Sequence, residues 1–270
     1  TDAISWRSEG IKHKKNEIFL DVIEQCDLMI SSKGAIVSAE VRGSLKLRTL
    51  LSGMPECKLG LNDRLKLGNE HNYPNIVFED MKFHQCVKLS QFHEDKTISF
   101  IPPDGIFELM SYRLTNINVE PLIWCEMKVK ESSATRIEYT IKITSQFKEK
   151  HTANNIAVKI PVRSDVISPE IKCEAGSITY SPESESMNWI IKSLSGGRSE
   201  CARIKLSFPS VVEERKMRVT PPILSVNFEI PYFTISGVQV RYLKVSEKSG
   251  YQALPWVRYT TKSGSYNFRI

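Results

Sequence analysis

The stretch Ala35–Leu51, AIVSAEVRGSLKLRTLL, alternates apolar and polar residues over most of its length. Side chains of a β-strand point to opposite faces in turn, so this period of two predicts a half-buried antiparallel strand with a candidate bend at Gly43. The residues of the apolar face are Val37, Ala39, Val41, Leu45 and Leu47. The residues of the polar face are Ser38, Glu40, Arg42, Ser44, Lys46 and Arg48.

The same alternation recurs along the chain in short segments rich in β-branched and aromatic residues, which is typical of strands. These segments are RIEYTIKIT (136–144), NIAVKIPV (155–162), ARIKLSF (202–208), LSVNFEIPYF (224–233), VQVRYLKV (238–245) and SYNFRI (265–270). Turn residues separate them. The expected turns are Ser32–Gly34, Ser52–Glu56, Pro102–Gly105, Ser195–Gly197, Pro221–Pro222 and Ser263–Ser265. No long amphipathic helix, heptad or internal repeat is evident.

Many short strands joined by turns predict an all-β fold of antiparallel β-sandwiches. A length of 270 residues suits two sandwiches or one elongated one. The best candidate boundaries are 115–118 and 231–234. No flexible linker divides the chain, so one sandwich can be inserted into the other.

Charge and composition set further limits. The net charge of +6 favours acidic partners such as anionic lipid or phosphate, but such a mild excess decides little. The densest basic run is IKHKK, where Lys12, Lys14 and Lys15 are candidate contacts to anionic lipid; a solvated loop is the commoner explanation. No apolar run approaches the length of a membrane-spanning helix. The chain opens on Thr1 without a signal-peptide pattern and is interpreted as a fragment of a longer protein.

No pattern in the sequence indicates a metal site, a cofactor or catalysis. The six cysteines are widely and irregularly spaced, which favours reduced thiols over a zinc site or a disulfide framework. His84 and Cys86 can share a strand face, but two ligands do not make a metal site. No nucleophile elbow, phosphate-binding glycine loop or zinc-protease motif occurs. We therefore expect a binding module with no cofactor and no nucleic-acid partner, not an enzyme.

Three places are unusual for a sandwich and together predict a binding pocket. Asp21 interrupts the apolar stretch NEIFLDVIEQ and shares a strand face with Phe19, although an unpaired buried carboxylate is expensive. Arg48 lies on the polar face of its strand, and Trp256 and Arg258 share a face in LPWVRY. Two aromatic rings, a carboxylate and two cations suit an aromatic ligand with a polar tip. The alternative, a core phenylalanine, a rim tryptophan and surface ion pairs, is more common.

Longer segments resemble the C-terminal, signal-binding domain of the medium (mu) subunit of heterotetrameric clathrin adaptors. The matching segments include WRSEGIKHKKNEIFLDVIE (6–24), LSGMPECKLGLND (51–63), ISFIPPDGIFELMSYR (98–113), PPILSVNFEIPYF (221–233) and GYQALPWVRY (250–259). The resemblance covers essentially the whole chain. It implies two elongated β-sandwich subdomains, the first made of residues 1–118 plus 233–270 and the second, residues 119–232, inserted into it.

The resemblance also implies recognition of Tyr-x-x-Φ sorting signals in the cytoplasmic tails of membrane proteins, where Φ is a bulky hydrophobic residue. The implied tyrosine pocket consists of Phe19, Asp21, Arg48, Trp256 and Arg258. The implied Φ pocket consists of Ile18, Leu20, Val240, Leu243 and Val257. A peptide that extends a sheet presents alternate side chains to opposite sides, so two faces of the same strands can hold Tyr and Φ. Val240 and Leu243 fall on opposite faces of an ideal strand, so a bulge or an edge geometry has to be assumed near them.

Details of the resemblance favour the trans-Golgi and endosomal adaptor type. The stretch IKCEAGSITYSPESESMNW (171–189) has one lysine and three glutamates, whereas the endocytic type has a lysine-rich, phosphoinositide-reading patch there. The implied partners are the other adaptor subunits, an Arf-class small GTPase, clathrin and the membrane surface. The implied location is cytoplasmic, peripheral on trans-Golgi, endosome and coated-vesicle membranes. Thr1 aligns with a linker threonine that is phosphorylated in relatives.

Two other functions stay open at this point. The first is a peripheral phosphoinositide- or membrane-binding β-sandwich that acts through IKHKK. The second is another mu-homology coat subunit that does not bind tyrosine signals, which often lacks the pocket residues present here.

Overall fold

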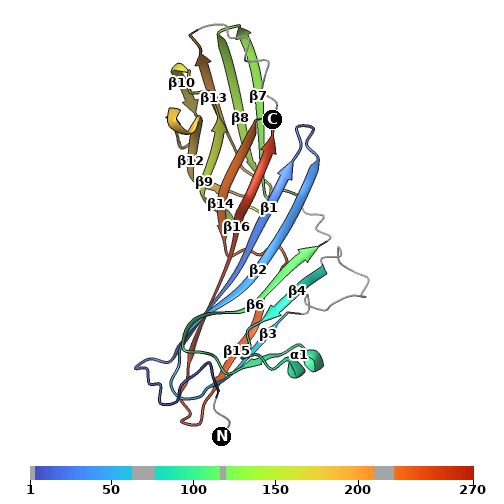
Figure 1. Ribbon diagram of the computed structural model, residues 1–270, viewed down its shortest axis with the longest axis vertical. Helices are drawn as coiled ribbons and strands as arrows, with labels where there is room; N and C mark the ends of the chain where they lie inside the picture. Colours follow the sequence, from blue (N-terminus) through green and yellow to red (C-terminus); the bar gives the residue numbers. More distant parts are fainter. Residues whose placement is uncertain (1–3, 63–76, 116–119, 210–221) are drawn as a thin grey trace. The chain divides into compact units, whose positions relative to one another are not determined.

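The structure is a computed structural model that describes residues 4–62, 77–115, 120–209 and 222–270 (Figure 1). Strands dominate these residues, so the predicted all-β fold is confirmed. The strands, in chain order, are β1 Glu17–Ile30, β2 Ile36–Leu50, β3 Glu56–Leu61, β4 Val77–Phe83, β5 Ile98–Phe100, β6 Gly105–Thr115, β7 Ile123–Ser133, β8 Arg136–Ser145, β9 Thr152–Pro161, β10 Ile167–Cys173, β11 Ser177–Ser181, β12 Ser186–Ser195, β13 Ser199–Ser207, β14 Ile223–Pro231, β15 Val240–Ser246 and β16 Leu254–Arg269. The helices are α1 Leu89–Asp95 and the short 3-10 helix η2 Pro182–Ser184.

The chain forms two compact units. Unit 1 consists of Thr1–Gln25, Glu40–Ile117 and Tyr232–Thr261, and unit 2 of Cys26–Ala39, Asn118–Pro231 and Lys262–Ile270. Unit 2 therefore includes residues 26–39 and 262–270, which the sequence-based division placed in the first subdomain. The reason is that β1, β2 and β16 are long strands that carry residues of both units. Inside unit 1 the sheets are β16–β1–β2–β6–β4 and β15–β3–β5; inside unit 2 they are β11–β12–β9–β14–β16–β1–β2 and β10–β13–β8–β7.

The alternation in Ala35–Leu51 is confirmed between Val41 and Leu50, where buried and exposed residues follow in turn along β2. The first four residues of the strand are all exposed, so its apolar face is buried only from Val41 onward. The pairing of β2 with β6 is irregular between Leu45 and Lys46, not at Gly43. Gly43 is needed for another reason: a Cβ atom there would lie 1.9 Å from the ring of Tyr112.

Most of the expected turns separate strands, but one does not. The predicted turn at Ser263–Ser265 is wrong, because β16 continues without a break to Arg269. Neighbouring segments bind the polar residues of this stretch inside unit 2. The N–H of Phe228 donates to Ser263 Oγ at 2.9 Å, and the N–H of Ser265 donates to a carboxylate oxygen of Asp27 at 2.8 Å. The predicted turn at Pro221–Pro222 lies partly outside the described residues.

A carboxylate is buried in the core of unit 1. Glu24, on β1, has no exposed surface. Its Oε2 accepts a hydrogen bond from the Tyr112 hydroxyl at 2.7 Å, and its Oε1 accepts one from the backbone N–H of Ser236 at 2.9 Å. Burial, with Glu24 beside it, raises the pKa of Tyr112 well above its ordinary value, so the phenol keeps the proton that it donates. Hydrogen bonds to both oxygens satisfy this buried carboxyl group.

The reactivity of the cysteine thiols can test how the side chains around them are packed. All six cysteines are free. Burial raises the pKa of three of them to about 12, and these are Cys57, Cys86 and Cys125. The thiolate is the reactive form, so at pH 8 we expect an alkylating reagent to modify the partly exposed Cys26, Cys173 and Cys201 first. Mass spectrometry over time measures the order, and modification of Cys125 as fast as Cys173 would contradict the packing.

Candidate functional site

The five residues of the predicted tyrosine pocket come from three adjacent strands of unit 1. Phe19 and Asp21 lie on β1, Arg48 on β2, and Trp256 and Arg258 on β16, and the sheet order is β16–β1–β2. Alternation along β1 and β16 places Phe19 with Asp21 and Trp256 with Arg258. The structure therefore gathers residues that are up to 239 positions apart in the sequence, as far as from Phe19 to Arg258.

Two pairs of side chains interact on this face. The guanidinium of Arg258 donates to both carboxylate oxygens of Asp21, from Nε at 2.8 Å and from a terminal nitrogen at 3.1 Å. This pairing raises the pKa of Arg258. The guanidinium carbon of Arg48 lies 5.5 Å from the ring centroid of Phe19, a cation–π arrangement. Asp21 therefore has a partner, and its side chain is 33% exposed, which resolves its apparent misfit in an apolar strand.

Trp256 adds an exposed aromatic surface. Trp256 is 54% exposed, which is unusual for a large apolar residue. Trp256 lies on the same face of β16 as Arg258, two residues on. An exposed tryptophan beside a paired acid and two arginines suits stacking against a planar ligand.

The predicted Φ residues divide into two groups. Val240 and Leu243 on β15 and Val257 on β16 are partly exposed, whereas Ile18 and Leu20 on β1 are completely buried. The last two therefore belong to the core of unit 1 and are not accessible to a ligand in this structure. The register of β15 with β3 is irregular between Val240 and Tyr242, in the stretch where the sequence analysis assumed a bulge or an edge geometry.

The first residues of β16 form a sheet edge. Among the described strands, β16 has β14 and β1 as neighbours. However, β14 ends at Pro231, and the N–H of the next residue, Tyr232, donates to the carbonyl of Tyr259 at 2.7 Å. The part of β16 before Tyr259 therefore has β1 on one side and no strand of the described chain on the other. Such an edge can pair with an extended peptide.

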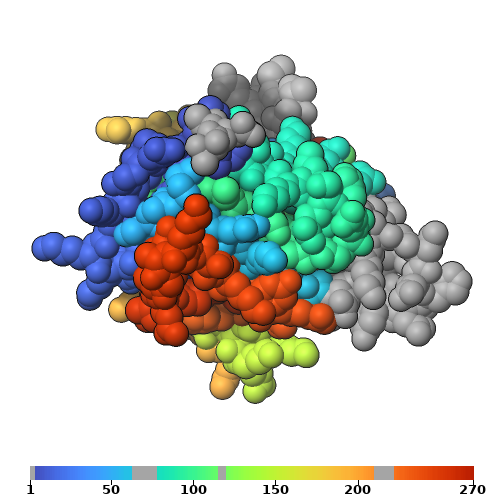
Figure 2. Space-filling view, turned by 90° about the horizontal axis from the view of Figure 1, so that it is seen from below, coloured from blue at the N-terminus to red at the C-terminus, as the bar shows by residue number. Residues whose placement is uncertain are grey.

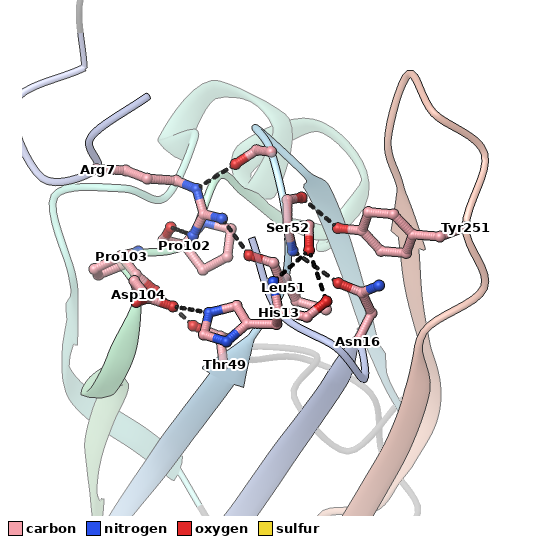
Figure 3. A network of polar contacts seen from close by, with 11 residues as sticks. Arg7, His13, Asn16, Thr49, Leu51, Ser52, Pro102, Pro103, Asp104 and Tyr251 are labelled. Atoms are coloured by element: carbon pink, nitrogen blue, oxygen red, sulfur yellow. Dashed lines mark hydrogen bonds and ion pairs between the residues drawn. The ribbon is translucent and has the colours of Figure 1, made fainter. Parts of the chain in front are cut away.

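A polar network holds the beginnings of β1 and β16 in place (Figure 3). The Asn16 side-chain oxygen accepts the N–H of Ser52 at 2.8 Å, and its carbonyl accepts the N–H of Leu254 at 3.0 Å. The Tyr251 hydroxyl donates to the carbonyl of Ser52 at 2.7 Å. In Figure 2 the orange-red loop between β15 and β16 lies against light-blue residues near position 50. These bonds join the two strands that carry the candidate pocket.

Arg7 and His13 anchor the segment before β1. Arg7 is 4% exposed and donates to three carbonyls, those of Gly53 at 2.8 Å, Pro102 at 3.1 Å and Leu51 at 2.6 Å (Figure 3). His13 Nε2 lies 2.9 Å from a carboxylate oxygen of Asp104. Little in the sequence indicates these roles, because Arg7 binds main-chain carbonyls, which no side-chain pattern reveals.

The other residues that the sequence analysis considered add little to the candidate site. Lys12, Lys14 and Lys15 are exposed on either side of the anchored His13, and Thr1 lies outside the described residues. In the described chain no cluster of three or more metal-binding side chains occurs. His84 Nδ1 instead accepts the N–H of Cys86 at 3.1 Å. None of the described helices is long and apolar enough to cross a membrane.

Tyr232 is a residue that the sequence-based search did not select for the site. It is 79% exposed and has a φ of 60°, in the left-handed region that bulky residues rarely adopt. Its hydrogen bond to Tyr259 places it beside Arg258, at the end of the open edge. The only signal in the sequence was its place in a candidate boundary, Pro231-Tyr232-Phe233-Thr234.

Comparison with known structures defines the class of fold. A yeast delta-COP-I mu-homology domain matches with a TM-score of 0.69 at 16% identity, over 96% of this chain and all of that one. A zebrafish (Danio rerio) Fcho1 mu-homology domain with a bound Eps15 peptide matches with a TM-score of 0.61 at 11% identity, over 98% of this chain and 99% of that one. The fold is therefore that of a mu-homology domain.

Comparison with known sequences then gives the family. Residues 4–270 match the adaptor complexes medium subunit family, and the chain belongs to it. It is 53% identical to the AP-1 complex subunit mu-1-I of Caenorhabditis elegans and 50% identical to the AP-1 complex subunit mu of Dictyostelium discoideum. Both alignments cover the whole chain but 64% of the relative, so the chain spans about two thirds of the length of these proteins.

Proposed function

We propose that the chain binds Tyr-x-x-Φ signals in the cytoplasmic tails of membrane proteins by adding the signal peptide to the open edge of β16. The observation that supports this most is the Asp21–Arg258 pair, with Arg48 over Phe19, on the sheet face beside that edge. The phenol of the peptide would donate to Asp21 and accept from an arginine, while its ring lies between Phe19 and Trp256.

The hydrophobic residue of the signal would lie on the other side of the peptide strand. Tyr and Φ are three positions apart and so point to opposite sides of an extended chain. On that side Val240, Leu243 and Val257 offer a partly exposed apolar surface. Ile18 and Leu20 would support this surface from the core and would meet the ligand only if the outer side chains move.

A peptide titration tests the proposal. Because two side chains and a few main-chain bonds anchor the peptide, we expect micromolar affinity, roughly −7 to −8 kcal/mol. Isothermal calorimetry compares a Tyr-x-x-Φ peptide with the same peptide in which Tyr is Ala. Equal binding of the two peptides would refute the proposal.

Variants of the chain locate the site. Trp256→Ala is expected to weaken binding by tenfold or more, because stacked aromatic anchors contribute about 2 kcal/mol or more. The matched control is Leu89→Ala, which removes a 50% exposed apolar side chain from α1, outside the three strands that carry the pocket. If both variants bind like the original chain, the peptide does not bind at the predicted pocket.

The coat context extends this proposal to the longer protein. We propose that the chain acts within a heterotetrameric AP-1-type adaptor, with Arf-class GTPase and clathrin as partners through the complex. The supporting observation is the 50–53% identity with AP-1 mu subunits. The corresponding location is cytoplasmic, on trans-Golgi, endosome and coated-vesicle membranes. Weak single-signal binding suits such an assembly, because several tails bound at one membrane add avidity.

Direct lipid binding is a second candidate function, favoured by the exposure of Lys12, Lys14 and Lys15 around an anchored histidine. Co-sedimentation with vesicles that contain phosphoinositide, in the absence of peptide, measures it. Binding that falls steeply with salt and with substitution of the three lysines would favour this function.

A further inference from the structure

Hydrogen bonds at its two ends fix the backbone directions along the open part of β16. The N–H of Leu254 donates to Asn16, on the β1 side, and the carbonyl of Tyr259 accepts from Tyr232, on the opposite side. Backbone groups of successive strand residues point to opposite edges. Residues 254, 256 and 258 therefore face β1, and Pro255, Val257 and Tyr259 face the open side.

The open side lacks a donor at one end and an acceptor at the other. Pro255 has no N–H, and proline in a sheet is tolerated where its missing donor faces an unpaired edge. The carbonyl of Tyr259 is already bound by Tyr232. Between these two positions Val257 offers both an N–H and a carbonyl, and Pro255 offers a carbonyl alone. Tyr259 contributes its N–H on this side. A peptide strand added there therefore meets two acceptors and two donors, and only Val257 supplies one of each.

Tyr232 closes the other end of this edge. Up to Pro231 the β14 strand lies beside β16, so β14 and an added peptide would occupy the same side of β16 one after the other. At Tyr232 the backbone turns with a φ of 60°, in the left-handed region that is strained for a bulky residue. The bond from Tyr232 to Tyr259 and the bond from the Thr261 hydroxyl to the carbonyl of Phe233, at 2.7 Å, hold this turn.

We propose that Pro255 and Tyr232 are positioning residues that limit an added peptide to a slot with one complete backbone pair, at Val257. This inference rests on the proposed function and specifies its site. From Pro255 to Tyr259 the slot measures about 13 Å at 3.3 Å per residue, and Tyr to Φ spans about 10 Å. The slot thus matches a tetrapeptide, and residues that flank the signal gain no main-chain hydrogen bonds.

N-methylation of each peptide amide in turn tests the slot by calorimetry with the whole 270-residue chain. We expect loss of at least fivefold in affinity at two positions only, two residues apart, where the peptide N–H groups face the carbonyls of Pro255 and Val257. Methylation elsewhere in the peptide backbone should change affinity by less than about twofold. A third sensitive position two residues further on would overturn the inference, because it would require a free Tyr259 carbonyl.

Pro255→Ala restores the missing donor. A peptide extended beyond the tetrapeptide at the Pro255 end should gain about twofold to tenfold in affinity for this variant relative to the original chain, and more than the tetrapeptide gains. The matched control is an extended peptide in which an ester replaces one amide, so that the carbonyl facing position 255 is a weaker acceptor. This peptide should not gain affinity for the variant. No gain for the extended peptide would overturn the slot limit. Absence of any tetrapeptide binding to the original chain would instead refute the proposed function.

Discussion

Replacing Asp21 with asparagine is expected to lower the affinity for a Tyr-x-x-Φ peptide by tenfold or more. Hydrogen bonds to a charged group contribute about 1.5–3 kcal/mol, and the amide offers the peptide phenol a neutral acceptor in place of a carboxylate. Arg258 also loses one of its two bonds to the residue at position 21, because the side-chain NH2 of asparagine cannot accept, and with it the two-point contact that fixes its orientation. Fluorescence anisotropy with a labelled peptide measures the change.

The same variant separates charge from size in the rejection of phosphotyrosine. Arg48, Arg258 and Asp21 together carry a formal charge of +1, so the pocket face as a whole does not repel a phosphate. The repulsion comes from Asp21, at close range. Asp21→Asn raises this sum to +2, and a phosphate carries about −1.5 to −2. We expect the original chain to reject the phosphopeptide and the variant to bind it, more weakly at high salt. If the variant also rejects the phosphopeptide, the size of the phosphate alone explains selectivity.

The sequence was sufficient for the elements that depend on local alternation. The exposed and buried faces of β2 from Val41 onward followed from side chains two residues apart. The turn at Ser263–Ser265 was wrong because serine and glycine also occur inside a strand when neighbouring groups bind the hydroxyl and the backbone. Those neighbouring groups come from distant parts of the chain, so a local turn pattern gives no information about them.

The candidate site was predictable in its side chains but not in its backbone. The sequence marks Asp21 as a carboxylate in an apolar strand. Among the described residues, however, the fully buried carboxylate is Glu24, three residues further on, and no sequence pattern indicated it. Its partners, Tyr112 and Ser236, are 88 and 212 residues away. The open edge depends on where β14 ends relative to β16, which is a property of strand pairing and is not visible in either segment alone.

Replacing Arg7 with alanine is expected to lower the free energy of unfolding by about 3 kcal/mol or more. The guanidinium donates to the carbonyls of Leu51, Gly53 and Pro102, and burial lowers its pKa without removing the charge. Its loss leaves these carbonyls without their donor, and each buried unsatisfied group costs about 1–3 kcal/mol. Urea denaturation followed by tryptophan fluorescence measures the difference.

Two further variants decide whether geometry or charge explains that loss. Arg7→Lys keeps the charge but cannot reach three diverging carbonyls from one ammonium group, so it should recover less than half of the lost stability. Arg42→Ala, which removes the arginine of an exposed pair with Glu40, should change stability by less than about 1 kcal/mol. If Arg7→Ala is as mild as Arg42→Ala, the segment before β1 is not held by this residue. In that case Asn16 and its bonds to Ser52 and Leu254 would have to position the start of β1 without it.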